Sequence, residues 1–147
     1  MPENAESLLN APFPDLPLTQ WIGPVLSFDE LRGKIVAVDF FATWCMPCLA
    51  EIPRNNDLMQ RLGDRGVVVL GICAGSGAES LPRIADERGI AYPLVRDEKR
   101  AAEKALRVRW YPCHYVIDRD GIVRADRVKF DQAAACIEEL LAAEEAE

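Results

Sequence analysis

Two cysteines three positions apart have the spacing that thiol–disulfide exchange requires. Cys45 and Cys48 enclose Met46 and Pro47, where an apolar run gives way to a predicted helix. The free N–H groups and the dipole at the start of a helix favour negative charge, so a cysteine there forms the nucleophilic thiolate readily. We therefore expect Cys45 to be the exposed nucleophile at the helix cap and Cys48, one turn further on, to displace the mixed disulfide. Pro47 suits the first helical turn, where a missing N–H is tolerated.

A CxxC pair also occurs in zinc sites, and the residues alone leave that alternative open. A closed zinc site needs four ligands, and the chain has no second CxxC. The candidates to complete a site are Cys73, Cys113 and His114, the sole histidine. A metal-binding or metal-delivering module built on Cys45, Cys48, Cys113 and His114 is therefore the alternative function. The position of the pair between a strand and a helix favours redox chemistry, in which electrons pass through the sulfurs without an organic cofactor or a metal.

Five cysteines in 147 residues do not suggest the framework of a secreted disulfide-rich domain. Cys73 ends an apolar run and Cys136 lies on the apolar side of the last predicted helix, so both are expected to be core thiols. Cys113 and His114 are interpreted as buried strand residues. A sharper hypothesis is that one of them approaches Cys45 and adds a third redox thiol or a metal site.

The elements that must position these residues can be identified from periodicity and turn signals. Uniformly apolar runs predict strands buried on both faces at 35–41, 67–73 and 113–117, with shorter strands at 92–95 and 122–127. Helices are expected at 46–62 with a kink at Pro53, at 80–88, at 98–106, and from a cap at Asp131 to about 143. The segment 20–33 is expected to form a short hairpin and turn. Strands that alternate with helices predict an α/β sandwich with a mixed sheet.

Length and charge restrict the class of protein. The chain is expected to fold as one domain over 1–147, with an irregular arm at 1–18 that carries four prolines. A formal net charge of −7 argues against nucleic acid or an anionic membrane as the partner. No apolar run approaches the length of a membrane span, and the first twenty residues lack the features of a signal peptide. As written, the chain is expected to be a cytoplasmic monomer; removal of a leader would place it in the periplasm or outside the cell.

Several stretches of the chain resemble the thioredoxin superfamily. The segment VDFFATWCMPC at 38–48 is similar to the active-site segment of that family, and Pro53 stands where thioredoxins kink the helix. The loop Trp110-Tyr111-Pro112, with the run that follows it, resembles the second signature, a cis-proline loop that enters a buried strand. The stretches 14–34 and 92–97 are similar to the TlpA-like branch. The resemblance covers about residues 12–142 and implies a thioredoxin-like three-layer sandwich, a mixed sheet flanked by helices, with an N-terminal extension.

The resemblance also implies roles for particular residues. Pro112 is expected to be cis and to face Cys45, which leaves the backbone of Tyr111 free to pair with a substrate strand. Asp39 matches the buried acid that thioredoxins place behind the second cysteine. Because burial disfavours the charged form, we expect a raised pKa for Asp39, which could then take the proton of Cys48 as that thiol attacks.

Residues that flank the pair are expected to form the substrate surface. Trp44 should pack beside the site, and Met46, facing solvent next to Pro47, should tune the redox poise. The TlpA-like branch more often carries an uncharged residue at the position of Asp39, which is a departure toward true thioredoxins. Glu79 lies near the place where TlpA-like proteins carry an active-site glutamate.

The sequence thus predicts a thiol–disulfide oxidoreductase that reduces protein disulfides through a Cys45/Cys48 dithiol–disulfide cycle. Its partners would be a protein disulfide and an upstream thiol reductant. A thiol peroxidase of the peroxiredoxin kind shares this fold and is a further alternative. Those enzymes need a threonine three residues before the attacking cysteine, where this chain has Ala42.

Overall fold

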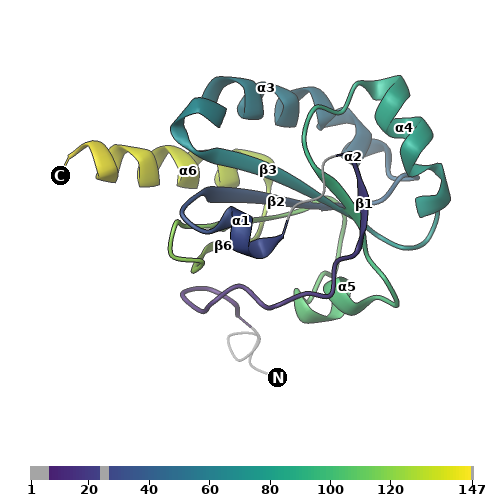
Figure 1. The fold of residues 1–147 in the computed structure, drawn as a ribbon, viewed down its shortest axis with the longest axis horizontal. Helices are drawn as coiled ribbons and strands as arrows, with labels where there is room; N and C mark the ends of the chain where they lie inside the picture. The colour runs from purple at the N-terminus through teal and green to yellow at the C-terminus, as the bar shows by residue number, and fades with distance from the viewer. Residues whose placement is uncertain (1–6, 24–26, 147) are drawn as a thin grey trace.

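A six-stranded sheet forms the centre of the protein, which a computed structural model describes over residues 7–23 and 27–146 (Figure 1). In the order β1-β4-β3-β2-β5-β6, its strands are β1 (Gln20–Ile22), β4 (Leu94–Arg96), β3 (Val67–Cys73), β2 (Ile35–Phe41), β5 (Cys113–Ile117) and β6 (Val123–Val128). β2, β3 and β4 run parallel to one another, whereas β1, β5 and β6 join their neighbours antiparallel. The sheet is therefore mixed, as the sequence predicts.

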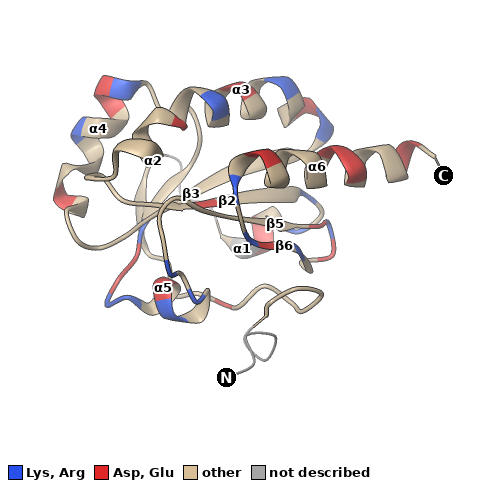
Figure 2. Ribbon diagram, turned by 180° about the vertical axis from the view of Figure 1, so that it is seen from behind, with Lys and Arg blue, Asp and Glu red and all other residues tan. Residues whose placement is uncertain are grey.

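Helices cover both faces of the sheet and complete the three layers. They are α1 (Phe28–Leu31), α2 (Met46–Ala50), α3 (Ile52–Leu62), α4 (Leu81–Arg88), α5 (Ala101–Ala105) and α6 (Phe130–Glu145), with 3₁₀ turns η2 (Gly63–Arg65) and η3 (Ala78–Ser80). Figure 1 shows α3 on one side of the sheet and α1 and α5 on the other. α6 belongs to the layer of α3, because Arg54 of α3 pairs with Asp131 of α6 (Figure 2 shows the two helices from behind).

β2 is the strand that carries residues toward the cysteine pair, and all seven of its residues are buried. In its antiparallel register with β5, Asp39 lies opposite His114 and Phe40 opposite Cys113. Directly paired residues point to the same face of a sheet, and successive residues point to opposite faces. Asp39 and His114 therefore face the layer of α3 and α6, whereas Phe40 and Cys113 face the layer of α5.

The helix expected over 46–62 is interrupted rather than only kinked. α2 ends at Ala50, Glu51 stands at the break, and α3 begins at Ile52 with Pro53 in its first turn. Proline has no N–H and its ring crowds the preceding turn, so it is tolerated only at a helix start. The break leaves Glu51 between the two helices.

Two local expectations are wrong. β1 pairs antiparallel with β4, with Gln20 opposite Arg96, so the segment 20–33 forms no hairpin in its described part; residues 24–26 lie outside the described residues. Asp131 does not cap α6 either. Lys129 occupies the cap position, and Asp131 lies in the first turn, where its carboxylate pairs with Arg54.

The N-terminal arm follows the edge of the domain without regular structure over 7–19. It is attached by an isolated bridge between Pro12 and Ile122 and by further hydrogen bonds on either side of it, such as that from the N–H of Asn10 to the carbonyl of Val123 at 2.8 Å. Residues 1–6 of the expected arm lie outside the described residues. Within the described part of the chain, no helix has the length and apolar character needed to cross a membrane.

Candidate active site

Cys45 and Cys48 lie at the start of α2, immediately after β2. Cys45 occupies the cap position, with extended backbone angles, and its sulfur accepts a hydrogen bond from the backbone N–H of Cys48 at 3.3 Å. Pro47 lies in the first helical turn, as the sequence predicts. The expectation that Cys45 is exposed is wrong, since only 6% of the residue is accessible. Its sulfur turns back over the helix start to meet that N–H, which partly encloses it.

Cys48 is the more deeply buried of the pair, with 1% of its surface accessible. Burial raises the pKa of its thiol far above the ordinary range, and the hydrogen bond to Cys45 raises that pKa further. The negative charges of Cys45 and Asp39 act in the same direction. Cys48 therefore remains a thiol until a base removes its proton.

Exposed apolar side chains lie on both sides of Cys45 in the chain and in the loop before Pro112. Trp44 and Met46, on either side of Cys45, are 59% and 67% exposed, and Trp110 is 50% exposed. The ring of Trp44 meets the ring of Tyr111 edge-on, with centroids 5.5 Å apart. Sequence reasoning assigned no role to Trp110, which directly precedes Tyr111 in the chain.

The loop before β5 contributes the proline expected from the sequence. The Tyr111–Pro112 peptide bond is cis. The Tyr111 ring stacks on Phe40 with centroids 5.8 Å apart, and its hydroxyl donates to Glu103 Oε1 at 2.8 Å. Tyr111 therefore joins the loop to both β2 and α5, which holds the loop in place.

Asp39 is buried beneath the pair, with 2% of its surface accessible. Its Oδ2 atom accepts a hydrogen bond from Asn55 Nδ2 at 2.8 Å, whereas Oδ1 has no hydrogen-bond partner among the described residues. Burial raises the pKa of the carboxyl group to about 6; His114 opposes this shift and the charge of Glu51 adds to it. A carboxyl group with this pKa exchanges protons near neutral pH.

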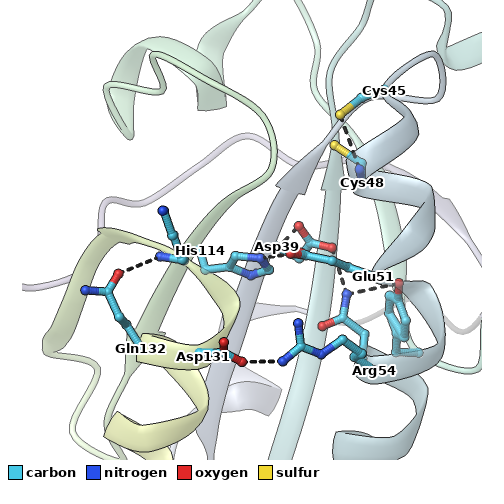
Figure 3. A network of polar contacts seen from close by, with 11 residues as sticks. Asp39, Cys45, Cys48, Glu51, Arg54, His114, Asp131 and Gln132 are labelled. Carbon is cyan, nitrogen blue, oxygen red and sulfur yellow. Dashed lines mark hydrogen bonds and ion pairs between the residues drawn. The ribbon is translucent and has the colours of Figure 1, made fainter.

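His114 lies between Asp39 and Glu51 (Figure 3). Its Nε2 atom is 2.8 Å from Glu51 Oε1, and its Nδ1 atom is 4.0 Å from Asp39 Oδ1. Sequence reasoning missed Glu51 and Asn55. Glu79, which it interpreted as an acid at a helix start, lies in the first turn of η3. The spacing could have found Glu51, because the third residue after Cys48 is almost one helical turn further along.

The four-residue metal module suggested by the sequence does not form. Cys113 lies on the other face of the sheet from His114, where its sulfur donates to Tyr115 Oη at 3.6 Å. Burial raises the pKa of the Cys113 thiol to about 11. Among the described residues, the one group of metal-ligand types that comes together is Asp39, Glu51 and His114, which contains no cysteine.

The other two cysteines have the positions expected of structural residues. Cys73 is fully buried at the end of β3, and burial raises the pKa of its thiol to about 12. Cys136 is half-buried on α6, packed against the core, and burial raises its pKa as well. Neither thiol belongs to the cluster beneath the Cys45–Cys48 pair.

Comparison with known proteins identifies a consistent set of relatives. Residues 9–126 match the AhpC/TSA family. Thiol-disulfide oxidoreductase ResA of Geobacillus kaustophilus is 32% identical over 111 residues, which are 76% of this chain and 64% of ResA. Protein DipZ of Mycobacterium tuberculosis is 33% identical over 138 residues, 87% of this chain and 20% of DipZ. The chain thus spans less than two thirds of the length of these curated relatives.

A solved structure of similar size confirms the thioredoxin-like fold. The thiol-disulfide isomerase of Corynebacterium glutamicum superposes with a TM-score of 0.78 at 26% identity. The match covers 90% of this chain and 97% of that one. The similarity therefore extends over the sheet and both helical layers.

Proposed function

Because the chain belongs to the AhpC/TSA family and has a thioredoxin-like fold of the TlpA-like branch, we propose that Cys45 and Cys48 catalyse thiol–disulfide exchange with protein disulfides. The observation that carries this proposal is the cap geometry of α2, in which the N–H of Cys48 donates to the sulfur of Cys45. A hydrogen bond and the positive end of a helix both stabilise a thiolate at that position. The names of the relatives, thiol-disulfide oxidoreductase and thiol-disulfide isomerase, support this activity over a peroxidase.

The reaction proceeds in two displacements. The Cys45 thiolate attacks one sulfur of the substrate disulfide, that S–S bond breaks, and the leaving thiolate takes up a proton. Cys48 then loses its proton and attacks the sulfur of Cys45, which releases the second substrate thiol and forms the Cys45–Cys48 disulfide. Two electrons pass from the enzyme dithiol to the substrate disulfide. An upstream thiol reductant must return them.

Asp39 is the base for the second displacement. The raised pKa of Cys48 means that its thiolate does not form unaided at neutral pH. Asp39 lies close enough for its charge to shift the Cys48 thiol, and its Oδ1 atom is the carboxylate oxygen without a hydrogen-bond partner among the described residues. We expect that atom to accept the proton.

The substrate lies across the apolar surface around the pair. Trp44 and Met46 provide exposed side chains on either side of Cys45, with Pro47 beginning the helix below. The backbone of Tyr111, before the cis-Pro112, is the group expected to pair with an extended substrate segment. Apolar contact with backbone pairing suits an unfolded or extended polypeptide better than a small polar disulfide.

The physiological direction is reduction, and the protein acts as a single-domain monomer. Asp39 favours this direction, as do the relatives of the TlpA-like branch. The reduction potential measured against glutathione tests it. A potential near about −120 mV, which is typical of a strong oxidant, would overturn the assignment as a reductant.

Substrate trapping tests the exchange mechanism itself. The Cys48→Ser variant retains the nucleophile but cannot resolve the mixed disulfide, so it should accumulate substrates on Cys45 as adducts that a reductant releases. The matched Cys45→Ser variant should trap few or none. Absence of adducts on folded Cys48→Ser protein would refute the proposed exchange.

A further inference from the structure

The only histidine of the chain is buried beneath the cysteine pair, in contact with two acids from other elements. His114 on β5 is 3% exposed, and its two ring nitrogens face different carboxylates. Nε2 meets Glu51, at the break between α2 and α3, and Nδ1 faces Asp39 on β2 (Figure 3). The proposed function uses Asp39 but gives this histidine no role.

Two carboxylates close together, one of them buried and the other partly buried, are unfavourable unless a cation accompanies them. Arg54 of α3 is the other cation near the cluster, but it pairs with Asp131 and lies over the ring of Phe130, 4.2 Å from its centroid. The ring of Phe130 of α6 also meets the His114 ring edge-on, with centroids 5.7 Å apart. The groups that face His114 are therefore Asp39, Glu51, Arg54 and Phe130.

The balance of these groups favours a charged ring. Burial lowers the pKa of His114, but the hydrogen bond with Glu51 and the charges of both acids outweigh burial and raise it overall, against a small opposing effect of Arg54. In return, the positive ring lowers the pKa of Asp39, which burial and Glu51 raise. Each member of the cluster thus sets the protonation of its neighbours.

We propose that His114 is a positioning residue for the second displacement: its imidazolium ring, held by Glu51, keeps the carboxyl group of Asp39 ionised and able to accept the proton of Cys48. This role rests on the proposed exchange reaction. If the ring were neutral, Asp39 would lie in an apolar site beside the charge of Glu51 and would bind its own proton more tightly. The carboxyl group of Asp39 would then already carry a proton at the pH where it must accept one from Cys48.

The same three residue types could hold a divalent metal ion, but their arrangement favours a proton-holding cluster. A metal draws its ligand atoms around one point, with one nitrogen of a histidine directed at it. Here the two ring nitrogens face two different carboxylates, and one of them is already within hydrogen-bond distance of its partner. Glu51 accepts the N–H of Nε2, and the charge of Asp39, 4.0 Å from Nδ1 and beyond hydrogen-bond distance, favours a second proton on the ring.

The test compares the wild type with His114→Gln, which retains a hydrogen-bond donor but no charge, between pH 5 and pH 9. Reduced protein is mixed with a disulfide-bonded peptide, and the phase that is independent of peptide concentration reports the second displacement. If Asp39 loses about one pKa unit of stabilisation, this phase should slow about fivefold at pH 6 and about twofold at pH 7, and should be unchanged at pH 9. Cys113→Ala is the matched control, because Cys113 directly precedes His114 on β5 and its side chain lies on the other face of the sheet.

A second measurement separates this proposal from the exchange mechanism. The carbon-13 signal of the Asp39 carboxyl group, followed through a pH titration of the reduced protein, should have a higher midpoint in His114→Gln than in the wild type. This titration requires no turnover, so it remains informative even if Cys48→Ser traps nothing. An unchanged midpoint in the folded variant would overturn the role of His114.

If His114→Gln does not fold, the wild-type protein decides the question. The nitrogen-15 signals of the His114 ring should show both nitrogens protonated at pH 6. A neutral ring at that pH would overturn the proposal. So would a stoichiometric divalent metal ion that is retained by the purified wild type and stripped by a chelator with a change in those ring signals.

Discussion

The backbone N–H of Cys48 donates a hydrogen bond to the sulfur of Cys45, with 3.3 Å between nitrogen and sulfur, while Cys48 itself is buried. The donor stabilises a thiolate on Cys45, and burial keeps Cys48 protonated. Iodoacetamide at pH 7 should therefore modify Cys45 before any other cysteine of the folded, reduced protein. Peptide mass spectrometry at early times measures the order. Labelling of half-buried Cys136 ahead of Cys45 would contradict this assignment.

Replacing the buried acid should make the protein more stable and the enzyme slower. Burial raises the pKa of Asp39 from an ordinary 3.8 to about 6 in the folded protein, so the unfolded chain gives up this proton at a lower pH. The stability that the protonated carboxyl contributes is present below about pH 4 and is lost as the pH rises to about 6. Asp39→Asn should therefore be more stable than the wild type by about 3 kcal/mol at pH 7 and nearly equal to it below pH 4.

Urea unfolding at several pH values measures this difference. Asp57→Asn on the exposed face of α3 is the control, since its carboxylate forms a surface pair with Arg61 that contributes little. A wild type whose stability rises between pH 4 and pH 6 relative to Asp39→Asn would show that the carboxyl group is ionised more easily in the folded protein than in the unfolded chain.

The exposed aromatic beside the nucleophile should affect substrates but not the fold. Trp44 is 59% exposed and touches Tyr111 edge-on, so truncation removes little buried surface. Loss of aromatic contact of about 1 kcal/mol should lower kcat/KM for a protein disulfide about fivefold in Trp44→Ala. A small disulfide reagent should react at the wild-type rate. Equal losses with both substrates would instead indicate damage to the Cys45–Cys48 pair.

Much of the scaffold could be predicted because its signals are local. The apolar runs at 35–41 and 67–73 have the bounds of β2 and β3, and the helix start at Cys45 follows from the strand that precedes it. Gly89 ends α4 in a left-handed conformation, as a glycine after a helical pattern indicates. Each of these features depends on residues that are neighbours in the sequence.

The cluster beneath the pair could not be predicted in the same way, because it depends on strand register. Asp39 and His114 meet only because β2 and β5 pair so that these two residues lie opposite each other. Cys113 directly precedes His114 on β5, so it points to the other face of the sheet, and the register decides which of the two lies beside Asp39. A shift of one residue would have exchanged the two, and nothing in the local sequence fixes that choice.

Cys113 should therefore be dispensable for the reaction. Its sulfur lies on the α5 side of the sheet, fully buried beside Tyr115, and its burial-raised pKa of about 11 keeps it protonated. Cys113→Ala should exchange disulfides within about twofold of the wild type and lose about 1 kcal/mol of stability, roughly the contribution of one buried methylene-sized group. Kinetics and thermal unfolding of the same preparation test both parts. A loss of activity greater than about tenfold, or about 1.4 kcal/mol in the activation barrier, would indicate that Cys113 takes part in the reaction.

The loop after β3 should position Trp44 through a single glycine. Gly77 has a φ of +80°, and its carbonyl accepts a hydrogen bond from Thr43 Oγ1 at 2.7 Å. A Cβ atom added to Gly77 would lie 2.9 Å from Thr43 Oγ1 and 3.1 Å from Trp44 Cδ1. Gly77→Ala should therefore both destabilise the protein, by about 1–2 kcal/mol for the left-handed backbone alone, and displace the indole. Exchange with a protein disulfide should fall as it does in Trp44→Ala.

Gly121→Ala separates the backbone effect from the steric effect of that substitution. Gly121 has nearly the same φ, +83°, but a Cβ atom added there meets nothing within 4 Å. Its replacement should therefore reduce stability by a similar backbone contribution while exchange with the protein disulfide stays at the wild-type rate. If both alanine variants exchange equally well, Gly77 serves only the turn. Slower exchange in Gly77→Ala alone assigns Gly77 to the position of Thr43 and Trp44, because the contacts with these two residues are what the two glycines do not share.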